Sequence, residues 1–159
     1  MNWITTSRII RTHSFPLGIA LLVPLLAFPA MATLGGEAAS IQQDASHFKA
    51  QIRMTQKQAY VVHEMQTAGG ATVREYVSSS GKVFGVAWEG PVIPDLQQVL
   101  GSYFARFQAT AQSRRRIYGP LVIHEAGLVL ESTGHMTAYR GTAYIPEMLP
   151  EGVHSDAIQ

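Results

Sequence analysis

The sequence of 159 residues contains no cysteine, and charged residues make up only 14% of it. Without thiols the chain can form neither a disulfide scaffold nor a thiolate metal site. Lys and Arg number 12 against 11 Asp and Glu, and this balance argues against a nucleic-acid-binding protein, which needs a strongly basic surface. Because 47% of the residues are hydrophobic, the composition is that of a folded protein rather than a disordered one.

The strongest hydrophobic run lies at the start of the chain and has the organisation of a secretion signal. Arg8 and Arg11 precede an apolar segment over residues 15–28, and Ala30-Met31-Ala32 gives a small-x-small cleavage pattern. The segment is interrupted by prolines and is too short for a comfortable membrane span. We therefore expect residues 1–32 to be a signal peptide that is cleaved near Ala32. Residues 33–159 would then form one domain in the periplasm or outside the cell, with no stable membrane anchor.

The pattern of apolar residues after position 32 predicts an α+β fold. Strands are expected at 60–66, 73–78, 83–88, 121–125, 128–132 and 136–145, with turns at Thr133-Gly134 and a kink at Gly141. A short N-terminal helix begins near Ile41, although residues 51–55 also alternate as a strand would. A long amphipathic helix follows the N-cap Asp95 and ends near the basic run 114–116. We expect an antiparallel sheet of two meanders packed against that one long helix.

Motifs that carry chemistry are missing from the sequence. It contains no G-x-S-x-G elbow, no glycine-rich phosphate loop and no HExxH pattern. The pairs His63-Glu64 and His124-Glu125 are adjacent in expected strands, so their side chains would point to opposite faces of the sheet. We therefore assign no catalytic residue, metal ligand or cofactor from the sequence, and we favour a protein that is not an enzyme.

Weak candidates for a binding site remain. They are Arg74, Glu75, Trp88 and His135, which would be worth testing if they lined one concave surface. The Arg74-Glu75 dipeptide is expected to contribute a cross-strand ion pair. An aromatic binding surface is conceivable from the tyrosines and Trp88, but most of these rings are expected in the core or at its edge.

The chain resembles a known family of exported proteobacterial proteins, catalogued as domain of unknown function 2844. The resemblance rests on short segments spread over the chain downstream of the cleavage point: 32–36, 60–64, 73–76, 81–84, 86–91, 94–96, 134–136 and 143–146. It implies export and a single domain. It implies no activity, cofactor or functional residue.

Three functions are compatible with these observations. The first is a non-catalytic periplasmic or secreted module that binds another envelope or secreted protein through its sheet. The second is a small periplasmic hydrolase, whose site would be assembled by the fold from Glu64, Glu75, His124 or His135. The third is a structural or chaperone-like subunit of an envelope assembly or secretion system, in which exposed sheet edges accept partner strands. The oligomeric state is left open.

The signal peptide is directly testable. Mass spectrometry of the native protein from an envelope or extracellular fraction should give a mature chain that begins at Thr33. An intact Met1 on a cytosolic species would contradict this prediction.

Overall fold

The computed structural model describes residues 34–114 and 119–159. The expected signal peptide, as well as Arg115 and Arg116 of the basic run, lie outside these residues. Within them, no helix combines the length and apolar character that a bilayer crossing requires.

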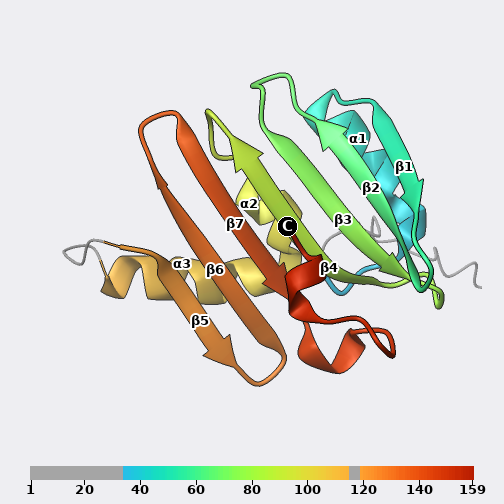
Figure 1. Ribbon diagram of the computed structural model, residues 1–159. Helices are drawn as coiled ribbons and strands as arrows, with labels where there is room; N and C mark the ends of the chain where they lie inside the picture. The colour runs from blue at the N-terminus through green and yellow to red at the C-terminus, as the bar shows by residue number, and fades with distance from the viewer. Residues whose placement is uncertain (1–33, 115–118) are drawn as a thin grey trace, which may run out of the picture.

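The described chain forms one antiparallel sheet with helices on one face, which is an α+β fold (Figure 1). The strands are β1 (Ile52–Gln56), β2 (Tyr60–Gln66), β3 (Thr72–Ser78), β4 (Val83–Gly90), β5 (Leu121–Glu125), β6 (Leu128–His135) and β7 (Ala138–Tyr144). Their order across the sheet is β1-β2-β3-β4-β7-β6-β5. The strands form one antiparallel sheet, as expected, in which the pairing of β4 with β7 joins β1–β4 to β5–β7.

Three details of the expected strands are corrected. The alternation at residues 51–55 belongs to β1, so the N-terminal helix ends earlier, at Phe48. The last hairpin turns at Met136 and Thr137, where Thr137 has a φ of 69°, and not at Thr133-Gly134, which pair within the β6–β7 ladder. Gly141 pairs with Trp88 and Ser132 in register on both sides, so the strand passes it without the expected kink.

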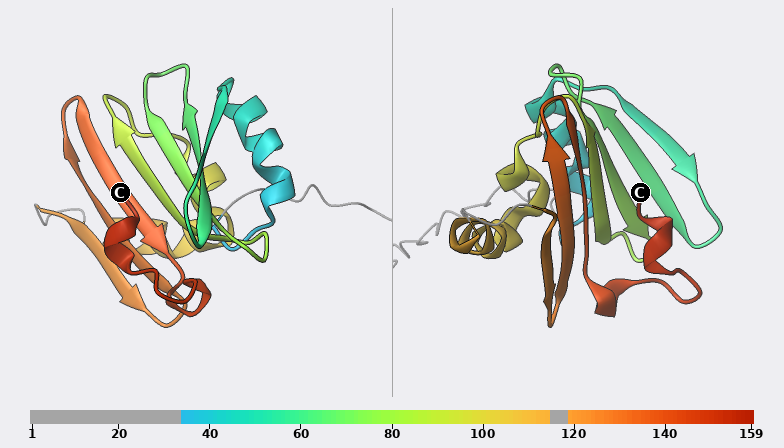
Figure 2. Two further views of the ribbon diagram at one scale, coloured as in Figure 1. Left: turned by 45° about the vertical axis from the view of Figure 1, so that its right-hand side comes forward. Right: turned by 60° about the vertical axis from the view of Figure 1, so that its left-hand side comes forward.

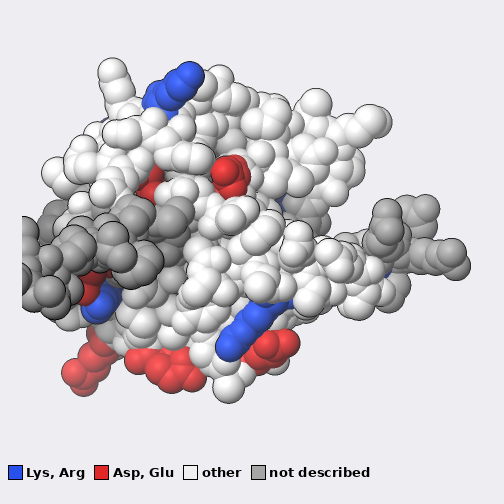
Figure 3. Space-filling view, turned by 180° about the vertical axis from the view of Figure 1, so that it is seen from behind, with Lys and Arg blue, Asp and Glu red and all other residues white. Residues whose placement is uncertain are grey.

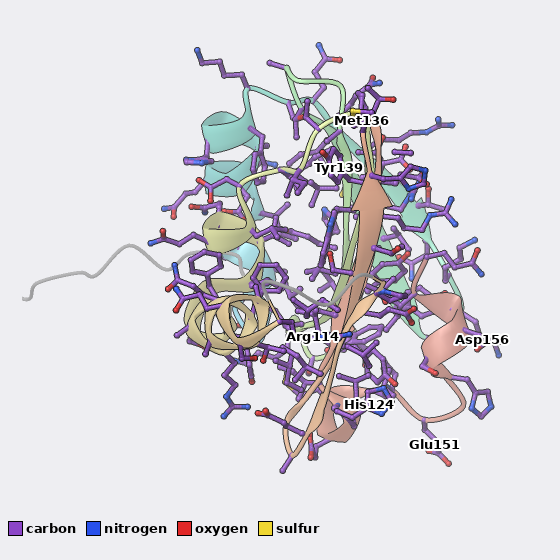
Figure 4. The ribbon with its side chains drawn as sticks, turned by 90° about the vertical axis from the view of Figure 1, so that its left-hand side faces the viewer. Arg114, His124, Met136, Tyr139, Glu151 and Asp156 are labelled. Carbon is purple, nitrogen blue, oxygen red and sulfur yellow. The ribbon has the colours of Figure 1, made fainter. Side chains whose placement is uncertain are left out.

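The helices are α1 (Ile41–Phe48), α2 (Leu96–Leu100) and α3 (Phe104–Ser113). All three lie on the same side of the sheet, behind it in Figure 1 and to the left of it in Figure 4. The expected N-cap is confirmed, because the Asp95 carboxylate accepts hydrogen bonds from the amides of Gln97 and Gln98. The prediction of a single long helix is wrong. Gly101, with a φ of 51°, ends α2, and a 3₁₀ turn over Gly101–Tyr103 connects α2 to α3.

The main core lies between the helices and the sheet. Val73, Val86 and Trp88 point from the sheet toward Ile41 of α1 and Val99 of α2, and all five are essentially buried. The side chains of α3 are less deeply packed, since none of its residues is fully buried. The surface on this side carries scattered charges among mostly uncharged residues (Figure 3).

The last residues of the chain lie on the opposite, helix-free face (Figure 2). After β7 the chain makes two 3₁₀ turns, Pro146–Met148 and Ser155–Ala157. A smaller core forms there, in which Ile158 packs with Tyr76, Phe84 and Ala87. We call this side of the sheet the open face, because in the described residues only this irregular segment covers it.

Gly141 explains how the large Trp88 ring fits between strand and helices. A Cβ atom at position 141 would lie 2.1 Å from the indole ring of Trp88, closer than any atom can approach. We predict that Gly141→Ala lowers the free energy of unfolding by roughly 1–3 kcal/mol, as overpacking of a core does. The measurement is denaturant unfolding. Thr142→Ala is the control, because Thr142 lies on the open face of the same strand, and an equal loss in both variants would contradict the explanation.

Candidate functional site

The candidate binding residues do not form one surface. Arg74 and Glu75 are neighbours in β3, so they point to opposite faces of the sheet: Arg74 lines the open face, whereas Glu75 is completely buried. Trp88 is 1% exposed and belongs to the main core. His135 ends β6 next to Met136, which lies at the exposed hairpin tip, at the upper end of the sheet in Figure 4.

The residues suggested for a hydrolase are also dispersed. Glu64 lies in β2 and His124 in β5, and four strands separate these two in the sheet. At about 4.8 Å per strand, their backbones are on the order of 24 Å apart. Glu75 is buried on the other face from Glu64, and His135 is at the end of a hairpin. The fold therefore does not bring these four groups together.

A groove lies on the open face and has a volume of about 830 Å³. Its floor is formed by outward-facing side chains of β2, β3, β4 and β7, and the last residues of the chain form one wall (Figure 2). The lining residues include Tyr60, Glu64, Arg74, Tyr76, Glu89, Thr142 and Ile158.

Arg74 is the central charge of this groove. Its Nε atom donates to Glu64 across the β2–β3 pair and its Nη2 atom donates to Glu89 of β4, each over 2.8 Å. Burial alone would lower the pKa of Arg74, but the hydrogen bonds and charges of Glu89 and Glu64 outweigh it and raise this pKa. The prediction of a cross-strand ion pair is thus confirmed for Arg74, whose partners are Glu64 and Glu89. It is wrong for Glu75, which is buried on the other face of the sheet.

The two carboxylates fix the guanidinium in one orientation. Glu89 also lies 3.6 Å from Arg140 of β7, so the charges continue along the groove floor. Such a partly exposed network contributes little to stability. The network instead orients the Arg74 side chain. The Nη1 atom of Arg74 points at the groove wall and donates to the main-chain oxygen of Gln159 over 3.2 Å.

The groove already holds one polypeptide segment, the chain's own last residues. The Tyr76 hydroxyl donates to the main-chain oxygen of Gln159 over 2.8 Å and accepts from its amide over 2.9 Å. The Ile158 side chain is 4% exposed and lies against Gly85, where a Cβ atom would be only 2.8 Å from its Cδ1. Burying one such aliphatic side chain stabilises the contact by about 2 kcal/mol.

A second polar cluster is buried on the opposite, helix-covered face. Glu75 of β3 and Asp44 of α1 have no exposed surface, and Gln98 of α2 is 8% exposed. The Gln98 amide donates a hydrogen bond to Asp44 Oδ1. If both carboxyls were ionised, Asp44 Oδ2 and both Glu75 oxygens would have no donor among the described residues. A buried charge without a donor is costly, so the pair is expected to keep a proton.

The pKa values agree with a retained proton. Burial raises the pKa of Asp44 from 3.8 to about 6, against the lowering effect of hydrogen bonds from Gln98 and Glu75. Burial, together with the Asp44 charge and the hydrogen bond to Asp44, raises the pKa of Glu75 well above its ordinary value. At neutral pH the arrangement consistent with these pKa values is a protonated Glu75 that donates a hydrogen bond to the Asp44 carboxylate.

His63 is the third titratable group on this face. It lies directly opposite Glu75 in the β2–β3 pairing. Burial lowers the pKa of His63, and its Nδ1 atom has no hydrogen-bond partner in the described part of the chain. In that part, no three His, Asp or Glu side chains are arranged to hold a metal ion. We interpret this cluster as a structural link that ties α1 and α2 to the sheet.

Sequence reasoning identified Arg74 but missed most of both sites. Glu64 is a candidate in the sequence only through the His63-Glu64 pair and as a hydrolase residue, and no pattern in the sequence singles out Asp44, Gln98, Glu89 or Gln159. The strand alternation did contain one usable signal: a glutamate on the same face as Val73 and Val77 had to be buried. Its partners could not be found in this way, because they lie on helices whose packing no local pattern specifies.

The fold and the groove define the class of protein. It is a single-sheet α+β protein with helices on one face and a polar, tyrosine-lined groove on the other. More particularly, the chain belongs to the family described as protein of unknown function (DUF2844), whose model matches residues 30–158. The resemblance noted in the sequence is thereby confirmed. No curated protein and no solved structure matches the chain significantly.

The buried carboxyl pair predicts how stability depends on pH. The raised pKa values mean that the folded protein binds protons more tightly than the unfolded chain. Their contribution to stability is therefore complete below about pH 4 and is lost as the pH rises through 6 and beyond. We predict that Glu75→Gln, which keeps a donor for Asp44, reduces the fall in melting temperature between pH 5 and pH 8. At pH 8 it should raise the free energy of unfolding by roughly 1–3 kcal/mol.

The matched control is Glu131→Gln, because Glu131 is exposed on β6. It should leave both the melting temperature and its pH dependence unchanged. A Glu75→Gln protein whose melting temperature falls between pH 5 and pH 8 as much as that of the wild type would show that Glu75 does not hold the proton.

Proposed function

We propose that this protein is an exported, non-catalytic binding module whose groove on the open face binds an extended segment of another envelope or secreted protein. Export is supported by the order of charged, apolar and small residues before position 33. The proposed location is the periplasm or the medium outside the cell.

The observation that carries the proposal is the unequal covering of the two sheet faces. The helices cover one face, whereas the other presents a groove of about 830 Å³ with oriented charged and hydroxyl groups. An antiparallel sheet needs only one covered face for its stability. The polar groups of the open face are therefore available for recognition.

A polypeptide is the ligand that this groove is best suited to bind. Arg74 and Tyr76 already bind the main-chain groups of Gln159, and Gly85 leaves room for an aliphatic side chain. These contacts recognise features that any extended peptide has, in the manner of grooves that combine main-chain hydrogen bonds with a side-chain pocket. A hydrolytic function has less support, since its proposed residues lie apart in the sheet.

The proposal can be tested by comparing partners captured by variants. Tagged mature protein should retain a specific partner from an envelope extract, and Thr142→Arg, which fills the groove, should reduce that capture at least tenfold. Gln112→Arg on the helix side, an exposed position, should capture as much as the wild type. Equal capture by both variants would show that binding does not use the open face.

A further inference from the structure

We propose that residues 154–159 are a displaceable internal ligand of the groove. The external ligand is then an extended polypeptide segment that replaces them, with an aliphatic side chain over Gly85 and main-chain groups bound by Arg74 and Tyr76. This inference rests on the proposed function and specifies both the chemistry of the ligand and how access to the groove is controlled.

The segment is anchored to the sheet at its end. The main-chain hydrogen bonds donated by Ala157 and Ile158 go to His154 and Ser155, three positions earlier in the same segment. The described segment therefore adds no strand to the sheet. Its closest contacts with the groove come from Ile158 and Gln159, whereas residues 154–156 are exposed.

Departure of the segment would leave the central charge of the groove paired. Arg74 donates to Gln159 through Nη1, but its Nε and Nη2 atoms are bound to Glu64 and Glu89 independently of the segment. The guanidinium would keep both carboxylates and its orientation. Arg74 would lose the partner of its Nη1 atom, and the Tyr76 hydroxyl would lose both of its contacts with Gln159 and would then face the groove and its solvent.

Gly85 determines which side chain the ligand needs. A Cβ atom at position 85 would lie 2.8 Å from the Cδ1 atom of Ile158, so Ile158 packs directly against the backbone of β4 at this point. Tyr76, Phe84 and Ala87 surround the pocket with apolar atoms. A charged residue there would be buried without a partner, so the ligand must carry an aliphatic side chain at this point.

The neighbouring residue of the ligand is recognised by its main chain. The Tyr76 hydroxyl donates to the main-chain oxygen of Gln159 and accepts from its amide, so these two contacts do not involve the Gln159 side chain. The groove continues past this point toward Glu89, Arg140 and Thr142. The groove therefore has unfilled space beside the internal segment.

The experiment uses the full mature chain and a fluorescein-labelled hexapeptide with the sequence of residues 154–159. Ile158→Asp should release the internal segment, since it places a carboxylate in the apolar pocket. Fluorescence anisotropy should then show saturable peptide binding, with an apparent affinity at least tenfold higher than for the wild type, in which the tethered segment competes at a high effective concentration.

Two matched controls define the site. A hexapeptide in which the residue equivalent to Ile158 is aspartate should not bind. The double variant Gly85→Val with Ile158→Asp should lose peptide binding at least tenfold, because the new side chain fills the pocket. Binding of both peptides, or unchanged binding to the double variant, would overturn the assignment of the pocket.

Hydrogen exchange on the wild-type protein gives a test that needs no folded variant. The amides of Ile158 and Gln159 should exchange at least a hundredfold faster than that of Ala87 in β4, because the segment opens locally. Equal exchange rates, or an Ile158→Asp protein that no longer folds, would show that the segment is an integral part of the fold. The groove could still bind a partner in that case, and the capture experiment with Thr142→Arg would decide this separately.

Discussion

The antiparallel pairing of β4 with β7 is the interaction on which the rest of the structure depends. It joins two meanders, which are separated in the chain by α2 and α3, into one seven-stranded sheet. On the helix side it places Trp88 over Gly141, in the main core. On the open face it places Glu89 opposite Arg140, in the floor of the groove. Both the core and the groove therefore extend across this one pair of strands.

The two faces of the sheet stabilise ionisable side chains in different ways. On the open face Arg74 remains ionised, because two carboxylates and access to solvent compensate for its partial burial. On the helix side Glu75, which is adjacent in sequence, is completely buried and is stabilised by keeping a proton and donating to Asp44. The alternation of a strand thus separates two neighbouring residues into opposite electrostatic environments.

Much of the local structure could be predicted from the sequence. The alternation of side chains located β2, β3, β4 and β5 closely, and Asp95 correctly marked the start of α2. The errors have physical causes. Gly101 breaks a helix whose apolar spacing is continuous, and Gly141, expected to bend a strand, instead makes room for a ring that comes from another strand. Each glycine serves a contact or conformation that composition does not reveal.

The sequence by itself determined most of the strands, the α+β class, the absence of thiol chemistry and the family, since these follow from local periodicity and from which residues are present. Only the tertiary structure decided which elements became neighbours. Asp44 meets Glu75, and Gln159 meets Arg74, across separations of tens of residues. Such contacts depend on strand order and on the packing of helices against one face, which arise from burial summed over the whole chain rather than from any short stretch of it.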